Sequence, residues 1–362
     1  FFIAVLPWGR LRLGGQNAPD YRFLPWVAML LCTLLAGGGV FFSAAEPLYH
    51  FQTPPPAFAD IKGSTPEAVA PALAQCHLHW GTLAWTSVAV LGAIVLSVGE
   101  QLHKLPLRPR SLLWPLFGGS PPAWLGTLID AISIIAVVAG TVGPIGFLSL
   151  QLSSAADQLF GIPDGAVSQL AVLCALGLVF SVSAASGIDR GIAWLSRLNV
   201  GIAVVLGLAL FALGRPLFVA SALGDSLVTY GTHGLSMAFT QEQPGWLGSW
   251  TWFYWGWFLG YAPIMSAFVA RISRGRPVRE LVLAVCVVAP LLTHVWFALL
   301  GGTGLGLELD QPGVITQVLA KQGMASTLIA IVGAMPGAPF WIGLTLVLVF
   351  CFLATAADSM SY

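Results

Sequence analysis

The stretch SWTWFYWGWFLGYAPIMSAFVARISRGRPVRE, residues 249–280, decides the fold of this chain. Its first part, residues 249–270, is apolar and crowded with aromatic side chains, and an arginine-rich segment follows at once. An apolar run of about 20 residues predicts a membrane-spanning helix, and arginines at one end predict that this end faces the cytoplasm. Because aromatic rings are negative on their faces, several rings around a cavity would attract a cation such as a quaternary ammonium group.

The composition of the whole chain agrees with a membrane location. Hydrophobic residues make up 57%, charged residues 8%, and the mean hydropathy is +0.85, whereas about a quarter of a soluble domain is charged. The formal net charge is zero and no basic face is present, which excludes nucleic acid as a partner. The five cysteines are scattered and indicate packing rather than a disulfide framework or a metal set: Cys32, Cys76, Cys174, Cys286 and Cys351.

The hydropathy pattern predicts an all-α polytopic membrane protein with about eight full transmembrane helices and one partial helix. The partial span is residues 1–8, and the full candidates are 25–46, 80–99, 124–151, 166–186, 192–213, 249–270, 281–300 and 338–358. The chain opens without an initiator methionine and stops just after an apolar run. We therefore interpret it as a fragment of a longer protein.

The basic residues predict the orientation. If the loop 9–24 is cytoplasmic, the same side of the membrane receives twelve of the fifteen lysines and arginines, and the other side receives only Lys62, Arg215 and Lys321. The long outer loops 51–79, 214–248 and 302–337 are expected to hold surface helices, because their apolar stretches are too short or too broken to span.

Three spans carry features that a passive anchor does not need. Gly37, Gly38 and Gly39 in the first full span predict either a local unwinding whose carbonyls hold a cation or substrate, or close packing of helices. Residues 140–146 of the third span predict a second interruption, where Thr141 either faces an ion path or bonds back to its own helix. Asp130, near the start of that span, is expected to be solvated or to cap neighbouring groups.

The last span ends with Thr355 and Asp358, and an acid at membrane depth indicates function. A position of Asp358 near the cytoplasmic interface is the alternative. The sequence CHLH at 76–79 completes no metal-ligand set, and the glycine-rich residues 301–306 follow a membrane span rather than a strand. We therefore expect neither a bound transition metal nor a dinucleotide, and we find no convergent nucleophile or base that would indicate an enzyme.

Aromatic residues of the span 249–270 recur on one helical face, at Trp250, Tyr254, Trp257 and Tyr261, with Phe258 beside them. The outermost tryptophans are typical of a membrane-interface belt, whereas the deeper ones are placed to line a cavity. A second aromatic group, residues 79–85, opens the second full span and could supply the other walls.

At these residues the chain resembles the betaine/choline/carnitine transporter (BCCT) family. The family signature is a Trp-Thr pair, an aliphatic residue, any residue, an aromatic, Trp, any residue and a Trp-Trp pair. Here it is WTWFYWGWF at 250–258, with departures at Trp252 and Phe258. Agreement extends to Pro263 and to the segments 270–276, 46–47, 79–81, 195–199 and 357–359.

The resemblance implies a LeuT-type fold of two inverted five-helix repeats preceded by two extra helices, of which this chain would lack the first helix and the last helices. Residues 1–24 would be the end of a preceding helix and a cytoplasmic loop. The first repeat would be 25–213, an extracytoplasmic connection 214–248, and a truncated second repeat 249–362. The protein would be an alternating-access transporter of the bacterial inner membrane, surrounded by lipid. The resemblance allows a homotrimer as its assembly.

The resemblance also implies the residues of a substrate site. Family members bind glycine betaine, choline, carnitine or dimethylsulfoniopropionate in an aromatic box, which here would be Trp80, Trp85, Trp257, Phe258 and Tyr261. The family has tryptophan at the last two of these positions, and it often has tyrosine where Val88 stands. A different or bulkier ligand is compatible with these changes.

Ion coupling follows from the resemblance as well. The unwound glycines 37–39 and Thr355 would hold Na⁺, but Ala356 stands where sodium-coupled relatives have serine. Coupling to H⁺, or ion-independent substrate exchange, are therefore alternatives to sodium symport. A channel is a further alternative, which the interrupted helices and aromatic clusters do not favour. No organic cofactor is expected.

Overall fold

The computed structural model describes the backbone of residues 2–34, 36–186 and 191–360. It also describes their side chains, except those of residues 33–37, 141, 144, 176, 179–195 and 353–360. These residues form helices and no β-strand. The α-helices are α1 Phe2–Val5, α2 Phe23–Leu34, α3 Ala36–Gln52, α4 Val69–Trp80, α5 Thr82–Trp85, α6 Leu91–His103, α7 Trp114–Phe117, α8 Ala123–Phe160, α9 Ala166–Ser186, α10 Gly191–Leu213, α11 Pro216–Phe239, α12 Pro244–Ser249, α13 Thr251–Ile272, α14 Val278–Leu283, α15 Ala289–Asp310, α16 Thr316–Gln322, α17 Met324–Gly333 and α18 Ala338–Met360.

Helices of membrane-spanning length and apolarity are present, which agrees with the prediction of a multi-pass membrane protein. Four stretches of the described chain meet both criteria: Pro66–His103, Ala123–Phe160, Ser196–Leu213 and Val278–Asp310. The remaining expected spans correspond to α2 with α3, α9, α13 and α18. The inverted-repeat organisation and the domain boundaries derived from the resemblance stay predictions.

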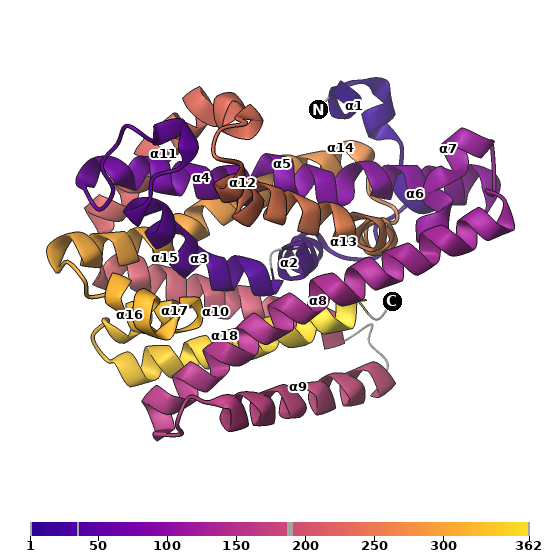
Figure 1. Cartoon of the computed structure of the whole chain (residues 1–362). Coiled ribbons are helices and arrows are strands. Elements are labelled where there is room, and N and C mark those ends of the chain that lie inside the picture. The colour runs from indigo at the N-terminus through magenta and orange to yellow at the C-terminus, as the bar shows by residue number, and fades with distance from the viewer. Residues whose placement is uncertain (1, 35, 187–190, 361–362) are drawn as a thin grey trace.

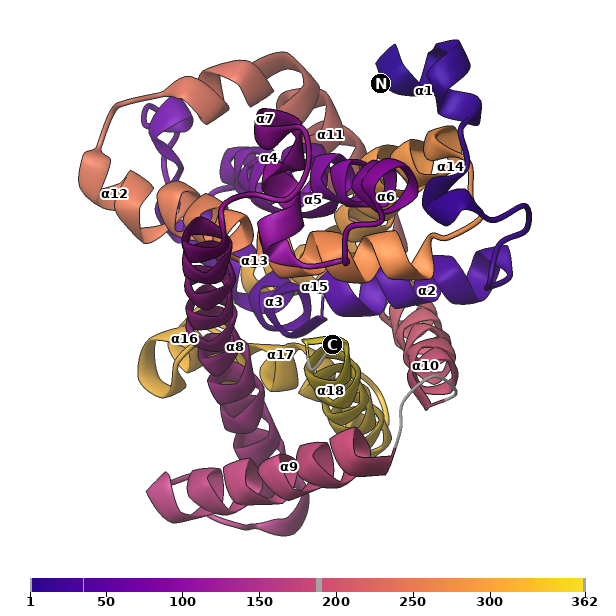
Figure 2. The ribbon, with the colours of Figure 1, turned by 90° about the vertical axis from the view of Figure 1, so that its right-hand side faces the viewer.

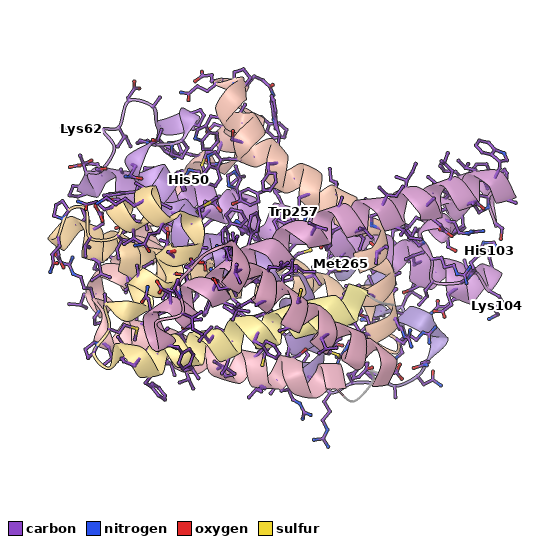
Figure 3. All side chains as sticks on the ribbon, turned by 60° about the horizontal axis from the view of Figure 1, so that its bottom comes forward. His50, Lys62, His103, Lys104, Trp257 and Met265 are labelled. Atoms are coloured by element: carbon purple, nitrogen blue, oxygen red, sulfur yellow. The ribbon has the colours of Figure 1, made fainter. Side chains whose placement is uncertain are left out.

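Most of the long helices extend from left to right in Figure 1, with α8 and α18 in front of α10 and with α9 along the lower edge of the molecule. Figure 3 places His50 and Lys62 toward one end of the molecule and His103 and Lys104 at the other. The charge pattern predicts that Lys62 and Lys104 lie on opposite sides of the membrane. We call the end that carries Lys104 and residues 271–279 the arginine-rich end.

Two helices, α2 and α3, occupy the first full span, and Gly38 and Gly39 are themselves helical rather than unwound. In Figure 1 α2 is seen nearly end-on while α3 extends to the left, and in Figure 2 the two views are exchanged, so the helices meet at a large angle. Gly38 and Gly39 lie in the first turns of α3, directly after the bend. The third span differs from its prediction, because α8 continues as one 38-residue helix through Gly140 and Pro144. Neighbouring helices at membrane depth can satisfy the backbone group that a proline frees.

The second span begins earlier than predicted, since α4 starts at Val69 rather than near residue 80. The backbone leaves helical geometry at Gly81, where ψ is −149° and α5 follows. A side chain at Gly81 would stand 2.6 Å from the His294 ring of α15, so this close approach requires glycine. Two π-helical turns, Thr86–Val90 and Ala284–Val288, then contact each other through Thr86 and Cys286. The outer segments 214–248 and 302–337 hold α11, α16 and α17. Surface helices were expected in these segments and in 51–79, but α17 and the part of α4 before residue 80 are largely buried, because they pack into the core.

The arginine-rich end is held by a contact between the N-terminal segment and the connection that follows α13. Arg12 pairs with Pro277 in an isolated antiparallel bridge, and the Leu13 amide donates to the Arg276 carbonyl at 2.9 Å. The Arg276 guanidinium lies 4.1 Å from the centre of the Trp26 ring and donates to Glu280 at 2.5 Å. Burial lowers the pKa of Arg276, and the Glu280 carboxylate opposes this change. This contact joins α2 to the connection between α13 and α14.

Candidate functional site

The candidate site is built on α13, whose aromatic residues recur with helical spacing. Tyr254, Phe258, Tyr261 and Met265 form its buried face, with exposed fractions of 0, 8, 8 and 0%. Trp257 lies at the edge of this face and is half-buried, and Figure 3 places it in the middle of the molecule. The opposite face, with Leu259, is exposed and has the apolar character of a lipid-facing surface.

Four of the five predicted box residues are brought together. Trp80, the last residue of α4, has its ring centre 5.3 Å from Phe258 and 6.2 Å from Trp257, with both pairs close to edge-to-face. Trp257 meets Tyr261 at 6.3 Å in the same manner. Edge-to-face packing turns ring faces in several directions, which is the arrangement that can surround a cation.

Trp85 is placed differently from the other four. Its indole N–H donates to the Thr293 hydroxyl on α15 at 3.1 Å, and its ring is buried in a separate apolar cluster with Phe268 and Val285. The described ring contacts do not join Trp85 to Trp80 or Trp257. The structure therefore assembles a four-ring cluster, which we call the aromatic cluster: Trp80, Trp257, Phe258 and Tyr261.

Two glycines allow α3 and α8 to approach this cluster. A Cβ atom at Gly38 would lie 2.6 Å from the Trp80 ring and 2.7 Å from the Trp257 ring. A Cβ at Gly140 of α8 would overlap the Tyr261 ring. Close packing is thus the role that the described contacts give to Gly38. Helices α3, α4, α8 and α13 all meet at the aromatic cluster.

The predicted ion-binding residues are largely outside the side chains that the structure describes. Gly37, Thr141, Thr355 and Asp358 occupy helical positions, but their side chains belong to the part left undescribed. Gly39 is buried in α3. Ion binding at all of these residues stays a prediction.

A cavity of about 640 Å³ opens at the arginine-rich end, between α13 and α8. Ile264 and Ala267, one to two turns beyond Tyr261, line it together with Ile134 of α8. Two ion pairs lie at its wall: Asp130 accepts from the Arg110 amide at 2.8 Å and guanidinium at 2.6 Å, and Glu100 pairs with Arg274. Asp130 therefore caps a neighbouring group, as the sequence predicted. Among the lining residues Ile264 is the nearest along α13 to the aromatic cluster, about one turn from Tyr261.

A buried polar group adjoins the cluster on the side away from this cavity. Glu46 of α3 is completely buried, and its carboxylate accepts four hydrogen bonds. Trp80 Nε1 donates at 2.8 Å and the Tyr254 hydroxyl at 2.9 Å to Oε2. His79 Nδ1 lies 2.6 Å and His50 Nε2 3.3 Å from Oε1. We call these five residues the Glu46 network.

The Glu46 network contains three groups of the kind that can bind a metal ion. Glu46, His50 and His79 each offer a ligand atom, and these atoms lie within 4.8 Å of one another. The same atoms already take part in hydrogen bonds, and His79 Nε2 is engaged 2.9 Å from both the Gln75 amide and the Thr251 hydroxyl. The three candidate ligand atoms are therefore already engaged in hydrogen bonds, whereas His50 Nδ1 is buried without a partner among the described side chains.

Sequence reasoning recognised Glu46 and His79 only as parts of short motifs and did not connect them. The spacing of Glu46 and His50, four residues apart on one helix, was a local signal that both would face the same way. No local signal indicates that α4 would supply His79 and Trp80 to the same carboxylate. That convergence depends on how α3, α4 and α13 pack.

Comparisons with known proteins agree with this arrangement. The sequence profile described as BCCT, betaine/carnitine/choline family transporter, matches residues 1–362. The chain belongs to this family. It is 44% identical over 98% of its length to glycine betaine transporter 2 of Vibrio parahaemolyticus, and it covers 66% of that protein.

Other relatives are more distant. Identity is 31% over 97% of the chain with the osmo-independent choline transporter BetT1 of Acinetobacter baylyi, of which the chain covers 67%. It is also 31%, over the full chain, with the glycine betaine transporter OpuD of Bacillus subtilis, of which it covers 70%. The chain thus spans about two thirds of the length of these relatives. They are transporters, which agrees with the expectation that this BCCT chain is not an enzyme.

Proposed function

We propose that this BCCT chain forms the solute-binding part of a secondary transporter for a small quaternary-ammonium or sulfonium solute, of the glycine betaine, choline, carnitine or dimethylsulfoniopropionate type, in the bacterial inner membrane. The observation that carries the proposal is the convergence of Trp80, Trp257, Phe258 and Tyr261. A trimethylammonium group cannot form ordinary hydrogen bonds, and ring faces attract it electrostatically.

The proposed mechanism is alternating access around this cluster. In this mechanism the cavity lined by Ile264 and Ala267 is part of the path by which solute reaches the cytoplasm. The aromatic rings bind the head group. Helix α3 can move relative to α2 when the site closes, because the two helices meet at a bend. Gly38 near this bend lets α3 touch the rings.

Transport is proposed to be coupled to an ion, either Na⁺ or H⁺. Uptake of labelled glycine betaine, choline, carnitine and dimethylsulfoniopropionate should be measured in proteoliposomes with the protein at its full native length, imposing sodium and proton gradients separately. Saturable uptake of at least one of these solutes, driven by one gradient, is the expected result. Flux that does not saturate would instead support a channel, and exchange without either gradient would support an antiporter.

Trp257→Leu tests whether the aromatic cluster binds the solute. Leucine keeps an apolar side chain but removes the ring face, so the apparent affinity for the transported solute should fall at least about tenfold. Trp252→Leu is the matched control, because Trp252 is 47% exposed on the outer side of the same helix. Unchanged affinity in Trp257→Leu, measured as the KM of uptake, would remove this ring from the site.

A further inference from the structure

We propose that Glu46 sets the charge preference of the aromatic cluster. Its buried carboxylate makes the rings select a positively charged head group over an uncharged group of the same shape. This inference rests on the proposed function, since it assigns to Glu46 a positioning and specificity role behind the rings that would contact the solute.

The hydrogen-bond pattern identifies Glu46 as an ionised carboxylate. Trp80 Nε1 can only donate, and it donates to Oε2 at 2.8 Å. His79 Nε2 faces the Gln75 amide nitrogen, which also can only donate, at 2.9 Å. In the tautomer that fits this contact, His79 Nε2 accepts and the proton is on Nδ1, 2.6 Å from Glu46 Oε1. An ionised carboxylate accepts from all of its partners, which is what Glu46 does.

No neighbouring cation cancels this charge. Among the described side chains the ion-pair partners of Glu46 are His50 and His79, and no lysine or arginine is among them. The tautomer with the proton on Nδ1 adds no positive charge at His79. His50 Nδ1 is buried without a partner, so a proton there would be unsatisfied, and His50 is neutral as well. The Glu46 network thus carries one negative charge in the interior of the molecule.

Trp80 transmits this charge to the candidate site. Its N–H is hydrogen-bonded to the carboxylate, while its ring meets Phe258 at 5.3 Å and Trp257 at 6.2 Å. Hydrogen bonding to an anion moves electron density toward the indole ring and makes its face more negative. The carboxylate also attracts a cation through space, and a water-poor interior strengthens that attraction. Both effects favour a positive head group and neither favours a neutral one.

The test compares solutes with their carbon isosteres, in which a tert-butyl group replaces the trimethylammonium group. The pairs are choline with neohexanol, and glycine betaine with tert-butylacetate. Binding to the purified full-length protein is measured by calorimetry and by competition with labelled uptake. In the unmodified protein the charged member of at least one pair should bind more tightly. In Glu46→Gln the affinity ratio within that pair should fall about tenfold, chiefly because the charged member binds more weakly.

A second variant distinguishes the loss of the charge from a folding defect in Glu46→Gln. In His50→Lys the carboxylate is retained and a cation is placed one helical turn from it, so the charge is neutralised and the affinity ratio should fall as well. Retained binding of the uncharged isostere shows that either variant is folded. Glu308→Gln is the matched control, because Glu308 is also buried and also accepts four hydrogen bonds, from residues 313–316. Its affinity ratio should remain that of the unmodified protein.

The outcomes separate this inference from the proposed function. If the unmodified protein binds none of the charged solutes, the proposed function is wrong. If it binds them but the ratio is unchanged in Glu46→Gln and His50→Lys, the charge role of Glu46 is wrong. An equal loss for charged and uncharged members would also overturn it, because that result assigns Glu46 a purely structural role.

Discussion

At the scale of single residues, the approach of helices to the aromatic cluster depends on the absence of side chains. Gly140→Ala would place a methyl group into the Tyr261 ring. The ring must turn or α8 must move, and we expect a loss of uptake affinity of about tenfold, because overpacking typically costs about 1–3 kcal/mol. The KM of solute uptake measures this effect.

Gly146→Ala on the same helix is the control, since a Cβ there meets no atom within 4 Å. It should leave KM unchanged and stabilise α8 slightly, because alanine is the better helix former. If the two substitutions had the same effect on KM, contact between Gly140 and Tyr261 would not matter for binding.

At the scale of elements, Arg276 makes several contacts that join the connection between α13 and α14 to α2, beside the hydrogen bond that Trp26 Nε1 donates to Ser273 Oγ at 3.0 Å. Arg276 stacks on Trp26, donates to the Tyr21 carbonyl at 2.7 Å, and pairs with Glu280. Arg276→Lys keeps the charge but loses the planar group that can make these contacts together. We expect a loss of about 1–3 kcal/mol of stability, observed as a lower Tm in detergent.

Arg108→Lys at the same end of the molecule provides the comparison, because no described hydrogen bond or ion pair involves the Arg108 guanidinium. Its Tm should stay close to that of the unmodified protein. An equal fall in Tm for both variants would mean that positive charge at this end, rather than the Arg276 contacts, stabilises the protein.

At the scale of the whole molecule, the distribution of basic residues predicts which end faces the cytoplasm. Lys62 and Lys104 lie toward opposite ends in Figure 3. In a background without the five native cysteines, Lys62→Cys should react with a membrane-impermeant maleimide added to intact cells. Lys104→Cys should react only after the cells are opened. The reverse pattern would invert the orientation and assign the cavity near Ile264 to the outside.

Much of the membrane architecture could be predicted from local sequence. Composition and spacing along the chain indicate the apolar span 249–270, the bend near Gly38 and the separation of the basic residues between two ends of the molecule. Each of these features can be recognised without knowing which residues are in contact. The recurrence of Tyr254, Trp257 and Tyr261 also predicted a ring-bearing face. Local pattern was insufficient for α8, where Gly140 and Pro144 indicated an interruption that the helix does not have. Whether a proline breaks a membrane helix depends on its neighbours.

The sequence by itself determined that the chain is a helical membrane protein and which residue types it offers to a solute. Only the tertiary structure decided which of those residues meet. In the folded chain Trp85 contacts Thr293, whereas Trp80 contacts the aromatic rings of α13. The tertiary structure also brought His79 and Tyr254 from separate helices to the carboxylate of Glu46. The physical reason is that hydropathy is a sum over neighbouring residues, whereas a buried polar group must find its partner across helices that are distant in sequence.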